Sequence, residues 1–375
     1  MGVWDVSRAH FYGKARRPIY IKLPPELHQP GELGLLLKTM YGVRDASSVW
    51  LETWNDHLRA NGFSVGRANP ALSHDDERKG FCHGDDLCVL GSRKALLDFD
   101  AILKKAFDVK CMGIIGYAED QKEVQVLNRT IRVVSDKGHV ELEPDSRLVK
   151  KILDDYNLHG AKPVPTPRVK RPPEEYHDAE TSSLLEGIEA TRYRSATMRA
   201  SYLAQDRIDI SECVKTLSQH MAHPREGHVA GVKRLARYLI DKQDYVLVYP
   251  LIGGGPRRLT IECSTDSDWA GDIVKRRYTS GVVIKVEGAL VWHSSTLQTV
   301  TSLSSTEAEF YATSKGARMA LGVQAYLNDL GVESGVILRT DSSGAKAFAE
   351  RRGLGQLRHI SVRYIWLQDR LAAKH

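Results

Sequence analysis

The spacing of apolar residues changes from a helical to a strand-like pattern near residue 258 of this 375-residue chain. Before that point, "SATMRASYLAQ", "DISECVKTLSQHM" and "GHVAGVKRLARYLIDK" repeat apolar residues at the 3.6-residue period of a helix. In the third stretch, the residues that share one face are Val229, Val232, Leu235, Ala236 and Leu239. The pattern therefore predicts consecutive amphipathic helices.

After residue 258 the sequence predicts short strands, because "RLTIECSTDSDW", "YTSGVVIKVEG" and "ALVWHSSTLQTV" follow one another with Gly288 at a hairpin turn. A long helix is predicted from Ser304 to Leu330, where Gly331 ends it. The strand "GVILRTDS" and further helices from Gly344 come next. The order β-β-β-α-β-α predicts a mixed α/β layer arrangement.

Two breaks divide the chain. Residues 160–178, "GAKPVPTPRVKRPPEEYHD", hold five of the fourteen prolines and show no apolar periodicity. Proline fixes φ and keeps the preceding residue extended, so a stiff extended connector is predicted between two halves. The second break, residues 250–258, contains three glycines and two prolines and ends the helical region.

The net charge of +6 is compatible with a polyanionic partner, although many enzymes are mildly basic. Lys233, Arg234 and Arg237 lie mostly off the apolar face of their helix, where they could follow phosphates or simply face solvent. No apolar run approaches the ~20 residues that span a bilayer, and the N-terminal residues do not form a signal peptide. The sequence therefore predicts neither a membrane span nor secretion.

Cysteine usage excludes two common scaffolds. The five cysteines are scattered, without a CxxC pair, at Cys82, Cys88, Cys111, Cys213 and Cys263. Neither a zinc ribbon nor a disulfide framework is supported by that spacing. We expect buried thiols in a reducing compartment.

Three acidic residues lie at the ends of the predicted C-terminal elements: Asp266 and Asp341 end strands, and Glu309 lies on the first turns of the long helix. Convergence of such ends would make a divalent-metal site, because hard cations take oxygen ligands. The alternatives are structural. Glu307 with Ser304 fits a capping box and is assigned to the cap, although Thr306 with Glu309 also fits one. Asp268 and Asp272 are either substitutes for Asp266 or solvated loop acids.

The stretch "HGDD" places Asp85 and Asp86 side by side after Gly84. Adjacent carboxylates repel each other, so a divalent cation is one explanation for the pair. An ordinary exposed hairpin tip is the other, because Gly and Asp are common turn residues.

Several long motifs, in the same order, resemble Ty1/copia-type retrotransposon Pol polyproteins over nearly the whole chain. "STDSDWAGD", "RRYTSGVVIKV", "VWHSSTLQTVTSLSSTEAEFYA" and "LRTDSSGAKAFA" resemble the ribonuclease H domain of that family. "YRSATMRASYLAQDRIDISECVKTLSQHMAHP" and "HVAGVKRLARYL" are similar to its connecting region, and "LVKKILDDYNLHGAKPVPTP" to the segment that ends its polymerase half. The resemblance implies an α+β, mixed α/β protein: a partial reverse-transcriptase palm and thumb in 1–159, a linker and helical connection in 160–256, and a ribonuclease H-like domain in 257–375.

In that family the polymerase motif is a Tyr-x-Asp-Asp hairpin, and "HGDD" occupies its place. "WDVSRAHFYG" resembles the first palm strand, whose aspartate would be Asp5, and "KTMYGVRDASSVW", with Arg44, resembles the segment that lines the template and nucleotide site. The resemblance implies that Asp5 and Asp85 bind catalytic metal, with Asp86 a less direct ligand since consecutive strand residues point to opposite faces. It likewise implies that Asp266, Glu309 and Asp341 hold Mg²⁺, or Mn²⁺, for RNA cleavage.

Three departures from the family pattern affect the expected activity. The chain begins close to the first palm strand, so the fingers region is expected to be missing. Asp45 stands where the family has Gln, and Ser361 stands where it has an acidic residue. We therefore expect ribonuclease H activity more than polymerisation. His359 and Arg363 would contact phosphate or, equally, form an exposed helix face.

Three functions remain open. The first is metal-dependent phosphoryl transfer on an RNA–DNA hybrid, with an RNA template, a DNA primer and the rest of a Pol polyprotein as partners. The second is a catalytically inactive remnant that binds nucleic acid or is inert, and the third is a nuclease that cuts DNA. The resemblance implies a cytoplasmic location, in a virus-like particle, or a nuclear one.

Overall fold

The computed structural model describes residues 1–27, 30–116, 120–169, 172–251, 258–272, 277–353 and 364–373. The chain forms two compact units. Unit 1 comprises Met1–Leu127 with Ala325–Glu333, and unit 2 comprises Asn128–Gln324 with Ser334–His375. These two units are defined by contacts within the fold, whereas the predicted boundaries at 159 and 256 follow the domains of the family. Those boundaries therefore remain a prediction.

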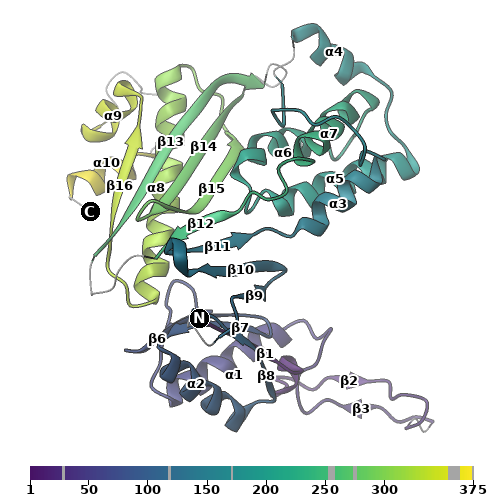
Figure 1. Cartoon of the computed structure of the whole chain (residues 1–375), viewed down its shortest axis with the longest axis vertical. Coiled ribbons are helices and arrows are strands. Elements are labelled where there is room, and N and C mark those ends of the chain that lie inside the picture. Colours follow the sequence, from purple (N-terminus) through teal and green to yellow (C-terminus); the bar gives the residue numbers. More distant parts are fainter. Residues whose placement is uncertain are drawn as a thin grey trace. The chain divides into compact units, whose positions relative to one another are not determined.

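Unit 1 contains a six-stranded antiparallel sheet in the order β4-β5-β6-β7-β1-β8. The strands are β1 (Gly2–Val6), β4 (Ser64–Val65), β5 (Leu72–His74), β6 (Arg78–His83), β7 (Asp86–Gly91) and β8 (Val109–Ile114). Helices α1 (Ala46–Ala60) and α2 (Arg93–Ala106) cover one face of this sheet (Figure 1). Trp4, Trp50 and Phe99 are almost fully buried in the core between them. Burial of such large rings is the main favourable term for this unit.

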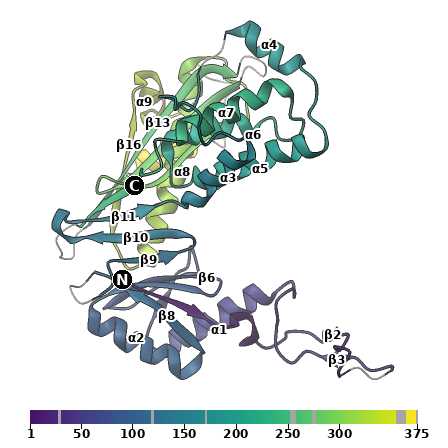
Figure 2. The same ribbon diagram turned by 45° about the vertical axis from the view of Figure 1, so that its right-hand side comes forward.

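A second feature of unit 1 is the arm formed by β2 (Tyr20–Ile21) and β3 (Gly34–Leu35), which pair in antiparallel fashion. The arm extends away from the sheet of its unit in both ribbon views (Figure 2). Strand β9 (Glu123–Val126) also belongs to this unit.

The first part of unit 2 packs helices against a common core. Its strands are β10 (Arg129–Val134), β11 (His139–Glu143) and β12 (Leu247–Pro250), and its helices are α3 (Ser146–Asp155), α4 (Pro173–Thr181), α5 (Gly187–Leu203), α6 (Ser211–Ser218) and α7 (Glu226–Leu239). The predicted apolar face of α7 is confirmed: Val232, Leu235 and Leu239 are at most 1% exposed, and Val229 is partly buried against the same core. Helix α3 also contributes Ile152 to that core.

The Pro-rich connector is shorter than predicted. It was expected to be extended through residue 178, but α4 begins at Pro173. Proline is well tolerated in the first helical turn, and Glu174 and Glu175 lie there as well, where their charge complements the helix dipole. These residues therefore start a helix instead of prolonging the connector. Residues 252–257 of the second break lie outside the described residues.

The second part of unit 2 is a mixed sheet in the order β15-β14-β13-β16, with β13 (Leu259–Asp272), β14 (Arg277–Val286), β15 (Ala289–Leu297) and β16 (Ser334–Thr340). Strands β13 and β16 are parallel, and the other pairs are antiparallel. Helix α8 (Ser305–Asp329) lies across the sheet (Figure 1), followed in sequence by β16, α9 (Ser343–Glu350) and α10 (Trp366–Ala372). The predicted order β-β-β-α-β-α is confirmed, as is the turn at Gly288, whose φ is +83°.

All five cysteines are free, and four of them are buried as predicted. The prediction is wrong for Cys111, which is exposed because it lies on β8, the edge strand of the unit 1 sheet. Across the described residues, we find no helix with both the length and the apolar character that crossing a bilayer requires.

Candidate active site

Asp266 and Asp341 are brought together by the register of two parallel strands. Thr265 of β13 pairs with Thr340, the last residue of β16, and each aspartate directly follows its threonine. Residues that follow register partners in a parallel pair lie side by side, and both aspartates are exposed. The prediction that Asp341 ends a strand is confirmed. The same prediction is wrong for Asp266, which lies within β13 opposite Gly281, because pairing with β14 carries β13 on to Asp272.

Glu309 completes the cluster from α8. One carboxylate oxygen from each of Asp266, Glu309 and Asp341 lies within 4.8 Å of the other two. The Glu309 side chain is oriented by Ser267, whose backbone N–H and hydroxyl donate to Oε1 at 3.1 and 3.0 Å. Helix α8 approaches β13 closely at Gly316, where a Cβ would collide with Thr265 and lie 2.9 Å from Cys263 Sγ.

The electrostatics of this cluster favour a cation. Burial raises the pKa of Glu309 above its ordinary value; the hydrogen bonds from Ser267 oppose the rise, whereas the charges of Asp266 and Asp341 add to it. Its Oε2 atom is buried with no hydrogen-bond partner among the described residues. Three carboxylates, one with an unpartnered oxygen, match the oxygen-only donor set of Mg²⁺ or Mn²⁺.

The neighbouring acids take structural roles. Ser304 Oγ accepts a hydrogen bond from the Glu307 N–H at 3.2 Å, which confirms the predicted cap. The Glu307 carboxylate, only 1% exposed, accepts from Leu303 N–H at 2.8 Å and from the Tyr311 hydroxyl at 2.6 Å. Asp268 accepts from the Thr279 N–H at 3.0 Å and is not part of the cluster. The side chain of Asp272 lies outside the described residues.

In unit 1, Asp5 of β1 is the direct register partner of Asp86 of β7. Register partners in an antiparallel pair point to the same face, so Asp5 shares its face with Asp86. The sequence had favoured Asp85 as the more direct partner. Burial raises the pKa of Asp86, and the charges of Asp85 and Asp5 raise it further. Of the described residues, these three do not place one oxygen each within 4.8 Å of one another.

The turn between β6 and β7 is a two-residue hairpin loop, Gly84–Asp85. Gly84 has φ +64°, a left-handed conformation that glycine adopts without strain, as predicted. The Gly84 carbonyl accepts a hydrogen bond from Trp50 Nε1 at 2.6 Å. The paired aspartates are therefore held by a buried side chain of α1 and are not a loose hairpin tip.

The residues predicted to contact nucleic acid lie in both units. Arg44 is exposed just before α1, and Asp45 is the N-cap residue of that helix. Lys233 is exposed, whereas Arg234 Nη2 donates to Thr166 Oγ1 and Arg237 Nε donates to the Lys162 carbonyl, both at 2.8 Å. Two of the three basic residues of α7 thus bind the connector. His359, Ser361 and Arg363 lie outside the described residues.

Two features escaped the sequence prediction. The first is the role of Ser267. Consecutive residues of a strand point to opposite faces, so its position directly after Asp266 could have indicated that its side chain faces α8. A second cluster of metal-ligating type, Glu180 with His220 and His228, was also missed. Its residues are separated by 40 and 8 positions, a spacing that no short motif encodes.

Comparison with known proteins gives one consistent picture, although no family model matches. The chain is 24% identical over 379 residues, 97% of its length, to the "Retrovirus-related Pol polyprotein from transposon TNT 1-94" of Nicotiana tabacum. It is 23% identical over 387 residues, 99% of its length, to the "Transposon Ty1-MR1 Gag-Pol polyprotein" of Saccharomyces cerevisiae. The chain spans only about a quarter of these relatives, 27% and 21% of their respective lengths.

Among solved structures, the fold is similar to a foamy viral protease-reverse transcriptase whose structure was determined in complex with an RNA/DNA hybrid. The match covers 99% of this chain and 42% of that chain, with a TM-score of 0.51 and 13% sequence identity. At that identity the likeness concerns the fold alone. It agrees with the predicted mixture of α and β layers.

Proposed function

Because the chain belongs to the Ty1/copia-type Pol polyprotein family, we propose that unit 2 cleaves the RNA strand of RNA–DNA hybrids. The observation that carries this proposal is the convergence of Asp266, Glu309 and Asp341 from two parallel strands and a helix, within 4.8 Å. A reverse-transcriptase and ribonuclease H-like character follows from the family. The hydrolytic activity and its residues are our proposal.

The three carboxylates would hold two divalent ions, Mg²⁺ or Mn²⁺. Bound ions would supply Lewis acidity that lowers the pKa of water and neutralises charge on the phosphodiester. Asp266 and Asp341, which are both exposed, would face the nucleic acid. Glu309, oriented by Ser267, would support them from the helix side. A hybrid would be recognised through its backbone and 2′-hydroxyls, without reading base identity.

The direct test is cleavage of a labelled RNA–DNA hybrid by the full chain in Mg²⁺ or Mn²⁺, with Asp266→Asn as the matched variant. We expect cleavage that disappears in Asp266→Asn and does not extend to duplex DNA. A folded protein that leaves the hybrid intact at every metal concentration would refute the proposal and favour an inactive remnant. Cleavage of duplex DNA would favour the DNA-cutting alternative.

A second candidate function is DNA synthesis at Asp5, Asp85 and Asp86. The register of Asp5 with Asp86 and the anchored Gly84–Asp85 turn support it. The wider spacing of these carboxylates and the Asp45 N-cap beside this segment make it the weaker candidate. Primer extension on an RNA template, compared between the parent chain and Asp86→Asn, tests it. Extension that persists in Asp86→Asn would exclude this site.

A further inference from the structure

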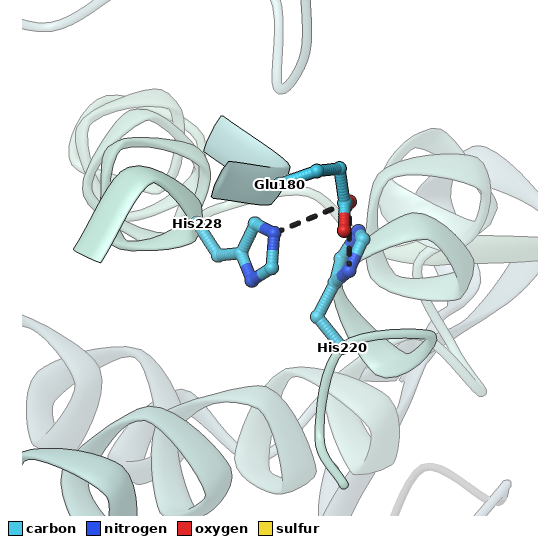
Figure 3. A group of neighbouring side chains, drawn as sticks. All are labelled: Glu180, His220 and His228. Carbon is cyan, nitrogen blue, oxygen red and sulfur yellow. Dashed lines mark ion pairs between the residues drawn. The ribbon is translucent and has the colours of Figure 1, made fainter. Parts of the chain in front are cut away.

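Glu180, His220 and His228 form a cluster of metal-ligating side chains that is separate from the carboxylates of the candidate active site (Figure 3). Glu180 is on the last turn of α4, His220 lies two residues after the end of α6, and His228 is on the first turn of α7. One nitrogen or oxygen from each residue lies within 4.8 Å of the other two. Three elements therefore direct their side chains to one point.

The distances in this cluster match ligand spacing. Glu180 Oε1 lies 3.4 Å from His220 Nδ1 and 3.3 Å from His228 Nε2. Two ligands of a tetrahedral zinc ion, at metal distances near 2.1 Å, are about 3.4 Å apart. The imidazole rings are stacked with centroids 3.8 Å apart and an interplanar angle of 28°. Because an ion lies in the plane of each imidazole that binds it, the stacked rings would have to rotate relative to each other to share one ion beside the carboxylate.

The backbone holds these residues in place without a ligand. Gly227, at the start of α7, approaches α4 so closely that a Cβ would lie 2.5 Å from Ala179 Cα. The segment after α4 is tied to the start of α7 as well, since Gly227 N–H donates to Ser182 Oγ at 3.0 Å and Glu226 N–H to the Ser183 carbonyl at 3.0 Å. Glu180 and His228 are thus preorganised relative to each other.

A hydrogen bond of His228 competes with metal binding. His228 Nδ1 accepts from the Arg225 N–H at 3.2 Å, as part of the cap of α7. A neutral imidazole carries one proton, so His228 then keeps its proton on Nε2, directed at Glu180. An ion at Nε2 would displace that proton and shift the ring to the other tautomer, at the expense of this cap bond. One long hydrogen bond is much weaker than the coordination of a structural metal ion.

We propose that Glu180, His220 and His228 bind a divalent transition-metal ion of the zinc type. Imidazole nitrogens suit zinc, whereas Mg²⁺ and Ca²⁺ favour oxygen-only ligand sets. The three residues line a cavity of about 610 Å³, together with Lys233, Arg234 and Arg168. Three protein ligands leave one position of a tetrahedral ion open. The cationic lining of the cavity would favour an anion or a water molecule as the remaining ligand.

The experiment is a zinc titration of the full chain in competition with a chromophoric chelator, in an Asp266→Asn background that disables the other cluster. We expect one equivalent of zinc, with an affinity that falls as the pH is lowered and protons compete for the imidazoles. His220→Ala and Glu180→Gln should each lower the affinity by roughly tenfold to 100-fold or more. His223→Ala is the matched control, because His223 is exposed, lies three residues along the same loop and is outside the cluster.

Absence of stoichiometric zinc binding would overturn the proposal, as would an affinity unchanged in both His220→Ala and Glu180→Gln. An equal loss in His223→Ala would also overturn it, because it would indicate non-specific histidine binding. Circular dichroism of each variant checks that the helices remain folded, and Glu180→Gln keeps the side-chain volume should His220→Ala unfold. Since the readout is zinc and not cleavage, the result is independent of the function proposed above.

Discussion

The Ser267 hydroxyl donates a hydrogen bond to Glu309 Oε1 at 3.0 Å, in addition to the bond from its own backbone N–H. Removing only the hydroxyl with Ser267→Ala should lower hybrid cleavage by roughly tenfold to 100-fold, as is usual for groups that orient metal ligands. The acid limb of the pH–rate profile should move to higher pH, because the charged form of Glu309 loses a donor. Ser264→Ala, at an exposed position of the same strand, is the control. An unshifted profile would show that Ser267 has no positioning role.

The raised pKa of Glu309 predicts how the stability of the metal-free protein depends on pH. Its pKa is raised in the folded state, so the folded protein takes up this proton more readily than the unfolded chain. The penalty for its charge is therefore full above the folded-state pKa, and stability rises as the pH falls through that pKa toward the ordinary value of 4.5. Glu309→Gln in EDTA should therefore raise Tm at pH 7 by about 2 °C, and that advantage over the parent chain should shrink as the pH is lowered toward 4.5. Glu350→Gln, exposed on α9, should leave Tm unchanged; a lower Tm for Glu309→Gln would contradict the prediction.

Two glycines of α8 should respond in opposite directions to the same substitution. A Cβ at Gly316 would collide with Thr265 of β13, whereas nothing lies within 4 Å of one at Gly322. Gly316→Ala should cost about 1–3 kcal/mol of unfolding free energy and shift Glu309 away from Asp266, with loss of cleavage. Gly322→Ala should stabilise the helix by roughly 0.5–1 kcal/mol. Urea unfolding and hybrid cleavage of both variants provide the measurement, and equal effects would argue against close helix–sheet contact.

The anchor of the "HGDD" turn can be tested with two tryptophans of one helix. Trp50→Phe removes the indole donor to the Gly84 carbonyl. Trp54 is also buried in α1 but, among the described residues, makes no hydrogen bond to that turn, so Trp54→Phe is the control. The first variant should lose about 1 kcal/mol more than the second, because the Gly84 carbonyl keeps only the weak Cys82 thiol as a side-chain donor, at 3.4 Å. Denaturant unfolding followed at unit 1 measures the difference. Equal losses would mean that the turn is held by packing alone.

The basic residues of α7 should differ in their contribution to nucleic-acid binding. Lys233→Ala should weaken hybrid binding and reduce the slope of log affinity against log salt by about 1, since Lys233 is exposed. Arg237→Ala should instead leave that slope nearly unchanged, because Arg237 is bound to the Lys162 carbonyl. Fluorescence anisotropy with a labelled hybrid distinguishes them. A full unit of slope lost in Arg237→Ala would show that the connector yields to nucleic acid.

Local patterns predicted the elements of the C-terminal sheet and placed Glu309 near the start of α8 and Asp341 at the end of β16, because these ends depend on nearby residues. The predicted strand end at Asp266 was wrong, since β13 is prolonged to Asp272 by its pairing with β14. The preference for Asp86 over Asp85 as the partner of Asp5 could not be predicted this way, since it depends on the register between distant strands. The same reason hid the contact of Glu180 with His220 and His228, which arises only when α4 packs on α7. Periodicity identifies faces, but tertiary packing decides which faces meet.

The contacts that hold the Pro-rich connector determine what a protease cut within it would do. Although rich in proline, it is fastened at several points: Arg234 binds Thr166, Arg237 binds Lys162, and Cys213 Sγ donates to the Pro167 carbonyl at 3.4 Å. Upstream of it, α3 is inserted into the core shared by α5 and α7. A single cut between residues 160 and 172 would therefore produce two fragments that stay associated, held by the same contacts. Cleavage of the peptide chain here would not separate the two fragments.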